Sequence, residues 1–387
     1  MNNWNKVKLG DLYDVHNGLS KGRQFFGKGY PFLTFSNVFN NWFLPKELDS
    51  LVETTDKERE ACSILRGDVF ITRTSETMNE LGMSSVALKD YPNATYNGFT
   101  KRLRPKTDMV MPEYIGYYLR SPKFRGKFMA FSSMTTRASL ANADLLGMEV
   151  ELPPMATQNK IATILSRYDD LIENYQKQIK LLEEAAQRLY KEWFVDLHFP
   201  GYENVKVVDG VPEGWENVSV GSLVSKVHRT KQIPTSKVLA EGDIPVIDQS
   251  RTFIAGYTND KEALIKVDKP VIVFGDHTRI LKYITFSFAK GADGTQLILS
   301  NNLKRMPQSL FYCSLVNVDL SNYSYARHFK YLKAEDIVLP TEQIASDFDK
   351  HTSLCFEKIH KLRSQLRLLT EARDRLLPKL MSGEIEV

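Results

Sequence analysis

The chain has 387 residues, of which 42% are hydrophobic and 25% are charged, and its formal net charge is +4. This composition is ordinary for globular proteins, so the chain can bury sizeable cores, and its mild basicity permits nucleic-acid binding without requiring it. The 3 cysteines form no CxxC pair, which argues against a zinc site and a disulfide framework. The sequence has no signal-peptide core and no apolar run long enough to span a bilayer, so we expect a soluble, cytoplasmic protein.

Residues 1–151 are predicted to form a first mixed α/β domain. Short runs of β-branched and aromatic residues bounded by turn residues, such as 68–72, indicate strands. Residues 22–29 (GRQFFGKG) come close to a phosphate-binding loop, but Gly29 stands where that loop needs a serine or threonine to hold magnesium. Two bulky aromatic residues also fill the loop, so we expect no nucleotide site there.

Residues 152–199 are predicted to form a central helical region. Alternate steps of three and four residues from Leu165 to Trp193 meet only apolar or aromatic side chains. This is the ~3.5-residue period of a coiled-coil seam. The dipeptide PG at 200–201 is a stop signal for the helix.

Residues 200–338 resemble the first segment and are predicted to form a second domain. Their opening WENVSVGSL at 215–223 is similar to WNKVKLGDL at 4–12. The two domains therefore share a start and differ in the lengths of their internal loops. A common scaffold with divergent loops is what two different binding specificities would need.

Residues 339–387 are predicted to form a C-terminal helical region that repeats the central one. The segment LLTEARDRL at 368–376 matches LLEEAAQRL at 181–189, an offset of 368 − 181 = 187 residues. The same offset produces a second, weaker seam in which Thr352 and Arg373 are polar defects. We expect this helix to end at the dipeptide LP at 377–378.

Two apolar seams in one chain can be buried by packing against each other. We therefore predict an α+β protein with a pseudo-two-fold repeat. Two similar mixed α/β domains are separated by two long helices, which pack as an antiparallel coiled coil. In the alternative that stays open, each helix packs only on its own domain.

Basic and polar side chains cluster in both domains. Arginine and lysine neutralise phosphates, while arginine, asparagine and glutamine can form paired hydrogen bonds with base edges. The candidate DNA-binding residues are Arg73, Asn97, Lys101, Arg102, Arg104 and Arg137 in the first domain, and Arg229, Gln249, Arg251, His277, Arg279 and Arg327 in the second. Each of them, taken alone, is also consistent with a solvated surface charge.

No catalytic motif accompanies these clusters. The histidines show no metal-ligand spacing such as HExxH, and the sequence has no GxSxG turn. The pair Pro153-Pro154 lacks the flanking residues of the tetrapeptide that amino-methyltransferases use. We therefore expect no catalytic residue, no metal site and no cofactor in this chain.

The duplicated plan, the LPPxxxQ segment at 152–158 and the two LLxEAxxRL helices resemble the specificity (S) subunits of type I restriction-modification systems. The final segment LPKLMSGEI at 377–385 is similar to that family's C-terminus. The resemblance implies two target-recognition domains, each of which reads one half of a split, asymmetric sequence in double-stranded DNA. It also implies that the helices set the spacer length and that the S subunit is not catalytic.

The same resemblance implies docking of two methyltransferase (M) subunits and of restriction (R) subunits. S-adenosylmethionine, Mg and ATP are then cofactors of these partners. The candidate docking residues lie on the apolar seams: Leu182, Leu189, Trp193, Leu369 and Leu376. The alternative is a coiled-coil adaptor that joins proteins without reading DNA, and salt-sensitive DNA affinity would separate the two.

Overall fold

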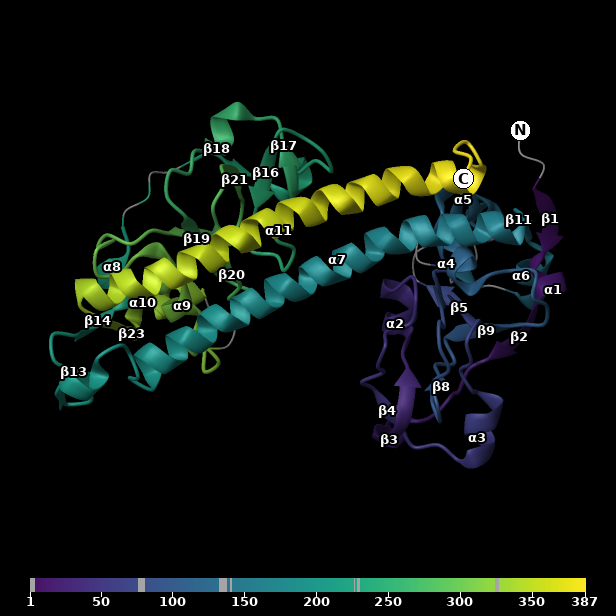
Figure 1. The fold of residues 1–387 in the computed structure, drawn as a ribbon, viewed down its shortest axis with the longest axis horizontal. Helices are drawn as coiled ribbons and strands as arrows, with labels where there is room; N and C mark the ends of the chain where they lie inside the picture. Colours follow the sequence, from purple (N-terminus) through teal and green to yellow (C-terminus); the bar gives the residue numbers. More distant parts are fainter. Residues whose placement is uncertain are drawn as a thin grey trace. The chain divides into compact units, whose positions relative to one another are not determined.

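The computed structural model describes residues 4–75, 81–131, 138–139, 141–225, 227, 230–323 and 327–387 (Figure 1). The chain divides into two compact units, Met1–Ile172 with Leu368–Val387, and Glu173–Arg367. The two longest helices, α7 (Met155–Tyr190) and α11 (Glu342–Ser382), each contribute residues to both units. Each unit therefore combines one mixed α/β domain with a segment of each long helix.

The first unit contains a four-stranded antiparallel sheet in the order β2–β9–β5–β7, together with shorter strand pairs. Its strands are β1 (Asn5–Lys8), β2 (Tyr13–Asn17), β3 (Phe26–Leu33), β4 (Leu51–Val52), β5 (Val69–Thr72), β6 (Thr74–Ser75), β7 (Ser84–Val86), β8 (Thr95–Tyr96), β9 (Thr100–Pro105), β10 (Ala138–Ser139) and β11 (Glu149–Leu152). Its short helices are α1 (Leu9–Leu12), η1 (Arg23–Phe25), α2 (Phe35–Asn40), α3 (Asp56–Ala61), α4 (Pro112–Arg120), α5 (Pro122–Phe131) and α6 (Asn142–Gly147).

The core of the first unit joins its sheet to both long helices. Helix α4 contributes the fully buried rings of Tyr114, Tyr117 and Tyr118. Leu165 of α7 and Leu380 of α11 belong to the same cluster of buried side chains. Because aromatic and aliphatic burial is the main favourable term in folding, this shared core holds the domain and the two helix segments together.

The second unit contains a three-stranded antiparallel sheet in the order β20–β19–β22 beside a five-stranded mixed sheet. Its strands are β12 (Val207–Val208), β13 (Val211–Pro212), β14 (Glu216–Ser219), β15 (Gln232–Ile233), β16 (Ile244–Ile247), β17 (Gly256–Thr258), β18 (Leu264–Ile265), β19 (Val271–Gly275), β20 (Leu281–Ile284), β21 (Phe288–Gly291), β22 (Thr295–Ile298) and β23 (Asp336–Leu339). Its short helices are η3 (Lys191–Val195), η4 (Tyr202–Asn204), α8 (Val220–Leu223), η5 (Thr235–Lys237), η6 (Lys261–Ala263), α9 (Gln308–Val316) and α10 (His328–Ala334).

The predicted internal repeat is confirmed by matching strand pairs in the two units. Strand β1 pairs antiparallel with β11, and β14 pairs antiparallel with β23 in the same way. The central strands correspond as well, because β5 is antiparallel to β7 and β9, and β19 is antiparallel to β20 and β22. The long helices begin at Met155 and Glu342, and 342 − 155 = 187, which is the offset of the sequence repeat.

The two long helices pack antiparallel within each unit, as the seams predicted. In the second unit, Glu183 of α7 pairs with Arg363 of α11 at 2.6 Å. Further along α7, Tyr190 packs on Phe348 of α11 with ring centroids 6.4 Å apart. A later position on one helix therefore faces an earlier position on the other, which defines antiparallel packing.

The predicted end of the second long helix at 377–378 is wrong. Helix α11 continues through Pro378 to Ser382. An interior proline removes one helical hydrogen bond and costs about 3 kcal/mol. The side chains of Leu377, Leu380 and Met381 are buried in the core of the first unit, and their burial offsets that cost.

Candidate nucleic-acid interface

The first domain brings two predicted residues together at one end of its four-stranded sheet. Strand β5 ends at Thr72, and the next N–H, that of Arg73, donates to the carbonyl of Phe99 at 3.0 Å. The Asn97 side chain accepts from the N–H of Phe99 at 2.7 Å and so stabilises the turn before β9. We call Arg73, Asn97 and Phe99 the first loop edge.

Phe99 was missed by the sequence interpretation, although its ring is 63% exposed. Phe99 is joined by backbone and side-chain hydrogen bonds to Arg73 and Asn97, so its apolar surface adjoins these two polar residues at one edge. The usable signal in the sequence is the dipeptide Asn97-Gly98, which is typical of a tight turn, followed directly by an aromatic residue.

Lys101 lies close to Arg73, but its side chain is buried. The Lys101 ammonium donates to the side chain of Asn142, the first residue of α6. Burial, with a smaller contribution from the charge of Arg73, lowers the pKa of the Lys101 amine. Lys101 therefore adds positive potential near the first loop edge without being a surface contact itself.

Arg102 and Arg104 have partners inside the first domain. The Arg102 guanidinium is buried, donates to the carbonyl of Ser63 at 2.6 Å and lies 5.4 Å from the ring centroid of Tyr96. Arg104 donates to both carboxylate oxygens of the buried Asp68, at 2.9 and 2.6 Å. Both guanidinium groups are thus paired within the first domain. Strand β9 has a neighbouring strand on each side, so buried polar side chains on it need partners inside the domain.

The second domain gathers a comparable set of polar side chains around Gln249. The Gln249 amide donates from Nε2 to the carbonyl of Asp293 at 2.7 Å, and its Oε1 accepts from the N–H of His277 at 3.1 Å. The hydroxyl of Thr278 donates to the carbonyl of Gln249 at 2.7 Å. The side chains of His277 and Thr278 are exposed. We call Gln249, His277, Thr278 and Asp293 the second loop edge.

The two loop edges are equivalent positions of the repeat. After β19, the N–H of Asp276 donates to the carbonyl of Gly294 at 2.7 Å, as the N–H of Arg73 does to Phe99 after β5. Gly294 has φ +77, and a Cβ at this position would lie 2.7 Å from the His277 ring. A glycine is therefore needed to build the second loop edge.

Arg279 and Arg327 flank the second loop edge. Arg279 has φ +61, and its guanidinium donates to the carbonyl of Leu320 at 2.9 Å. Arg327 is exposed at the start of α10, and the next N–H, that of His328, donates to the carbonyl of Asp276 at 2.8 Å. Four of the predicted residues, Gln249, His277, Arg279 and Arg327, are thus brought to one region.

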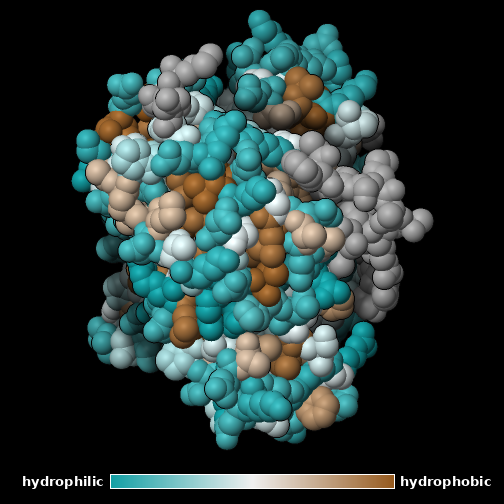
Figure 2. Space-filling model, turned by 90° about the vertical axis from the view of Figure 1, so that its right-hand side faces the viewer, coloured by the Kyte–Doolittle hydropathy of each residue, from teal (hydrophilic) through white to brown (hydrophobic). Residues whose placement is uncertain are grey.

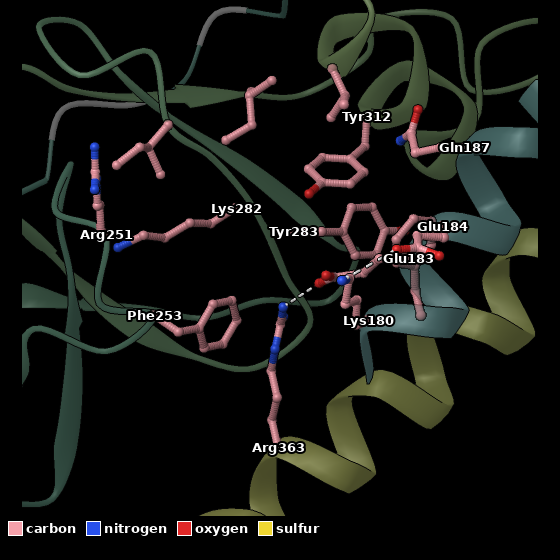
Figure 3. Close-up of a pocket in the computed structure, with 14 residues that line it drawn as sticks. Lys180, Glu183, Glu184, Gln187, Arg251, Phe253, Lys282, Tyr283, Tyr312 and Arg363 are labelled. Carbon is pink, nitrogen blue, oxygen red and sulfur yellow. Dashed lines mark hydrogen bonds and ion pairs between the residues drawn. The ribbon is translucent and has the colours of Figure 1, made fainter. Parts of the chain in front are cut away.

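Arg251 follows Gln249 by two residues and lines a pocket of about 440 Å³ in the second unit. Figure 3 shows Arg251 and Lys282 on one side of this pocket and Glu183 and Glu184 on the other. The pocket therefore carries charges of both signs. That mixture is less suited to a phosphate than a cluster of positive side chains would be.

Two predicted contacts, Arg137 and Arg229, lie outside the described residues. Among the residues that are described, no group of three or more His, Cys, Asp and Glu side chains could hold a metal ion. No helix in the same part of the chain is long and apolar enough to cross a membrane. The DNA-contact residues as a set remain predictions.

The predicted docking residues lie largely inside the fold. Trp193 is buried in the second core, Leu182 and Leu189 pack against that core, and Leu376 packs against the first. Leu369 is half-buried.

Other leucines on the long helices are exposed, namely Leu171 at 42% and Leu181 at 63% on α7, and Leu354 at 66% and Leu368 at 55% on α11. Leu181 and Leu368 are the first leucines of the two LLxEAxxRL segments and lie 368 − 181 = 187 residues apart, so the repeat itself marks them. In the view of Figure 2, the visible surface is mainly hydrophilic, with hydrophobic residues in a few small groups.

Comparison with known proteins agrees with these features. Residues 1–184 match the family described as type I restriction modification DNA specificity domain. The MjaIX specificity subunit of Methanocaldococcus jannaschii is 27% identical over 99% of this chain and 94% of that protein. The HindI specificity subunit of Haemophilus influenzae is 23% identical over 100% of both chains.

A solved type I S subunit from M. genitalium has the same fold. Its TM-score is 0.61 at 15% identity, and the match covers 98% of this chain and 96% of that one. Residues 1–184 therefore match a DNA specificity domain, and the chain is similar along its whole length to specificity subunits of type I restriction enzymes and shares the fold of one of them.

Proposed function

We propose that each of the two loop edges reads one half of a split, asymmetric DNA sequence. The observation that carries this proposal is the structural equivalence of the two edges. Strands β5 and β19 lead into corresponding loops, and the N–H groups of Arg73 and Asp276 make corresponding hydrogen bonds. Equal scaffolds let both domains meet a duplex in the same way, while different side chains give them different base preferences.

The side chains at the two edges differ in chemistry. At the first edge, Arg73 suits the O6 and N7 atoms of guanine, and Asn97 suits the N6 and N7 atoms of adenine. Phe99 adds an apolar surface that suits a thymine methyl group or an unstacked base step. At the second edge, the side chains of His277 and Thr278 supply hydrogen-bond donors and acceptors. The two half-sites are therefore expected to have different sequences.

Affinity is expected to come mainly from phosphate contacts. Arg279 and Arg327 flank the second edge and are suited to this role. Each released counterion makes binding weaker at higher salt. The alternative, an adaptor that joins proteins without reading DNA, predicts no such salt-sensitive and sequence-dependent binding.

The chain is expected to act inside a larger assembly. Two methyltransferase subunits would dock on the long helices, and restriction subunits would join them. The exposed Leu181 and Leu368 are the preferred docking residues, because the seam leucines are already packed within this chain. S-adenosylmethionine, Mg and ATP would then act in the partner subunits.

The experiment that tests the proposal compares variants of the two loop edges. The chain is co-expressed with its methyltransferase subunit, and the purified complex selects its target from randomised DNA. The variants Arg73→Ala and His277→Ala are then compared on the selected target and on duplexes altered in one half. Each variant is expected to lose discrimination at one half-site and to keep it at the other.

Two exposed lysines provide matched controls. Lys106→Ala in the first domain and Lys304→Ala in the second remove positive charge away from the hydrogen-bond networks of the loop edges. Neither is expected to change discrimination at either half-site. Equal loss at both half-sites in Arg73→Ala or His277→Ala would contradict independent reading by two domains.

A further inference from the structure

An arginine of α11 is held between an acid of α7 and an aromatic ring of the recognition domain in the second unit. Figure 3 shows Arg363 between Phe253 and Glu183. The guanidinium lies 2.6 Å from the Glu183 carboxylate and 3.8 Å from the ring centroid of Phe253. One side chain therefore contacts both long helices and a loop of the domain.

This arginine is mostly shielded from water. Burial lowers the pKa of the Arg363 guanidinium, and the charge of Glu183 acts in the opposite direction. Burial also raises the pKa of the Glu183 carboxyl, against the effect of Arg363. The Arg363 side chain is 26% exposed and that of Glu183 is 40% exposed, so the pair is partly desolvated, and cation–π contacts gain strength with desolvation.

Phe253 ends a loop that begins at the second loop edge. The buried ammonium of Lys282 donates to the carbonyl of Asp248 at 2.8 Å and to that of Thr252 at 2.6 Å. The loop is thereby folded around one cation. Gln249, next to Asp248, is the side chain that ties His277 into the second loop edge. A short path thus runs from Arg363 through its cation–π contact with Phe253 and the hydrogen bonds of Lys282 and Gln249 to the residues proposed to read DNA.

The first unit contains a comparable arrangement. Arg373 of α11 lies 2.7 Å from the Asp169 carboxylate of α7 and 5.1 Å from a ring of Trp42. The Tyr117 hydroxyl donates to the other Asp169 oxygen at 2.5 Å. The carbonyl of Trp42 accepts from the N–H of Val86 in β7, at the edge of the four-stranded sheet. Again one arginine joins both long helices to the domain.

We propose that Arg363 and Arg373 are positioning residues that each anchor one recognition domain on the helix segments of its unit. The anchor sets how the loop edge of that domain meets DNA. Loss of an anchor is therefore expected to weaken reading of one half-site only. This inference rests on the proposed function, because it assumes that each loop edge reads its own half-site.

The test uses the complete complex with the methyltransferase subunit. The variants are Arg363→Met and Arg373→Met, which keep the aliphatic stem, and the control is Arg375→Met on the same helix, where the side chain is 73% exposed. Binding is measured on the selected target and on duplexes altered in the first or the second half.

Arg363→Met is expected to lower discrimination at the second half-site about tenfold, which corresponds to about 1.4 kcal/mol, while discrimination at the first stays unchanged. Arg373→Met should show the opposite pattern. Arg363→Lys keeps the positive charge and is expected to recover part of the loss, because an ammonium pairs with Glu183 but stacks less well on Phe253. Arg375→Met should match the wild type.

Equal effects of Arg363→Met on both half-sites, or no effect on either, would overturn the inference. If that variant does not assemble, Phe253→Leu removes the ring and leaves the ion pair intact, and the same loss at the second half-site is expected from it. A wild-type complex that shows no sequence discrimination would instead overturn the proposed function.

Discussion

Arg104, one of the candidate DNA contacts, is expected to stabilise the fold of the first domain instead of contacting DNA. Its guanidinium donates to Asp68 at 2.9 and 2.6 Å, and the Asp68 side chain is 0% exposed. In Arg104→Met, the buried carboxylate keeps the N–H of Leu65 at 2.8 Å but loses its positive partner. Breaking a buried ion pair from one side costs about 3 to 5 kcal/mol. Because the Arg104 side chain is itself 27% exposed, we expect the lower end, about 3 kcal/mol.

Native-state hydrogen exchange on the complete chain measures this loss without requiring a single unfolding transition. The amides of β5 and β9 are expected to exchange about 100-fold faster in Arg104→Met. Adding Asp68→Asn removes the unpaired charge and should restore more than half of the protection. Lys106→Met, which removes a surface charge just beyond β9, is the control and should be near neutral. If Arg104→Met exchanged at the wild-type rate but lost DNA binding, the stabilising role would be refuted, and Arg104 would count as a DNA contact.

Three further outcomes follow from the second domain. Gly294→Ala places a Cβ 2.7 Å from the His277 ring at φ +77, so it should weaken discrimination at the second half-site and leave the first intact in binding assays. Burial lowers the pKa of Lys282 to about 8. Above that pH the folded chain has released the Lys282 proton while the unfolded chain still binds it, so folding becomes more favourable as pH rises. In urea titrations, the stability of the wild type relative to Lys282→Met should therefore rise by about 2 kcal/mol between about pH 8 and 9.5. A fall over this range would contradict the expectation. Arg327→Ala should weaken binding to all sequences alike and reduce the slope of log affinity against log salt by about 0.9.

The helices and the repeat could be predicted because their signals are local. A heptad seam is visible in one stretch of sequence, and an offset of 187 residues needs no knowledge of tertiary contacts. The role of Arg373 could not be read in this way. It looked like a defect of the seam, but in the first unit it meets Asp169, and that pairing depends on the register between the helices.

The sequence predicted which types of side chain lie at the candidate interface, but it predicted less well which individual residues do so. The sequence does not show which side chains of a strand find partners in the core, so Arg102 and Arg104 looked the same as Arg73. Phe99 was overlooked because residue type alone does not separate exposed aromatics from core aromatics, and only the preceding Asn97-Gly98 turn marks it. The equivalence of the two loop edges depends on strand pairing between distant segments.

The central claim is that one chain carries two separate reading surfaces for one split target. The most direct measurement is to co-express the chain with the methyltransferase subunit proposed as its partner and to map methylated bases across the DNA of the cell. The account predicts a single motif with two defined halves, a fixed gap and different sequences in the two halves. A continuous motif, or no methylation by a stable complex with an active methyltransferase, would contradict it.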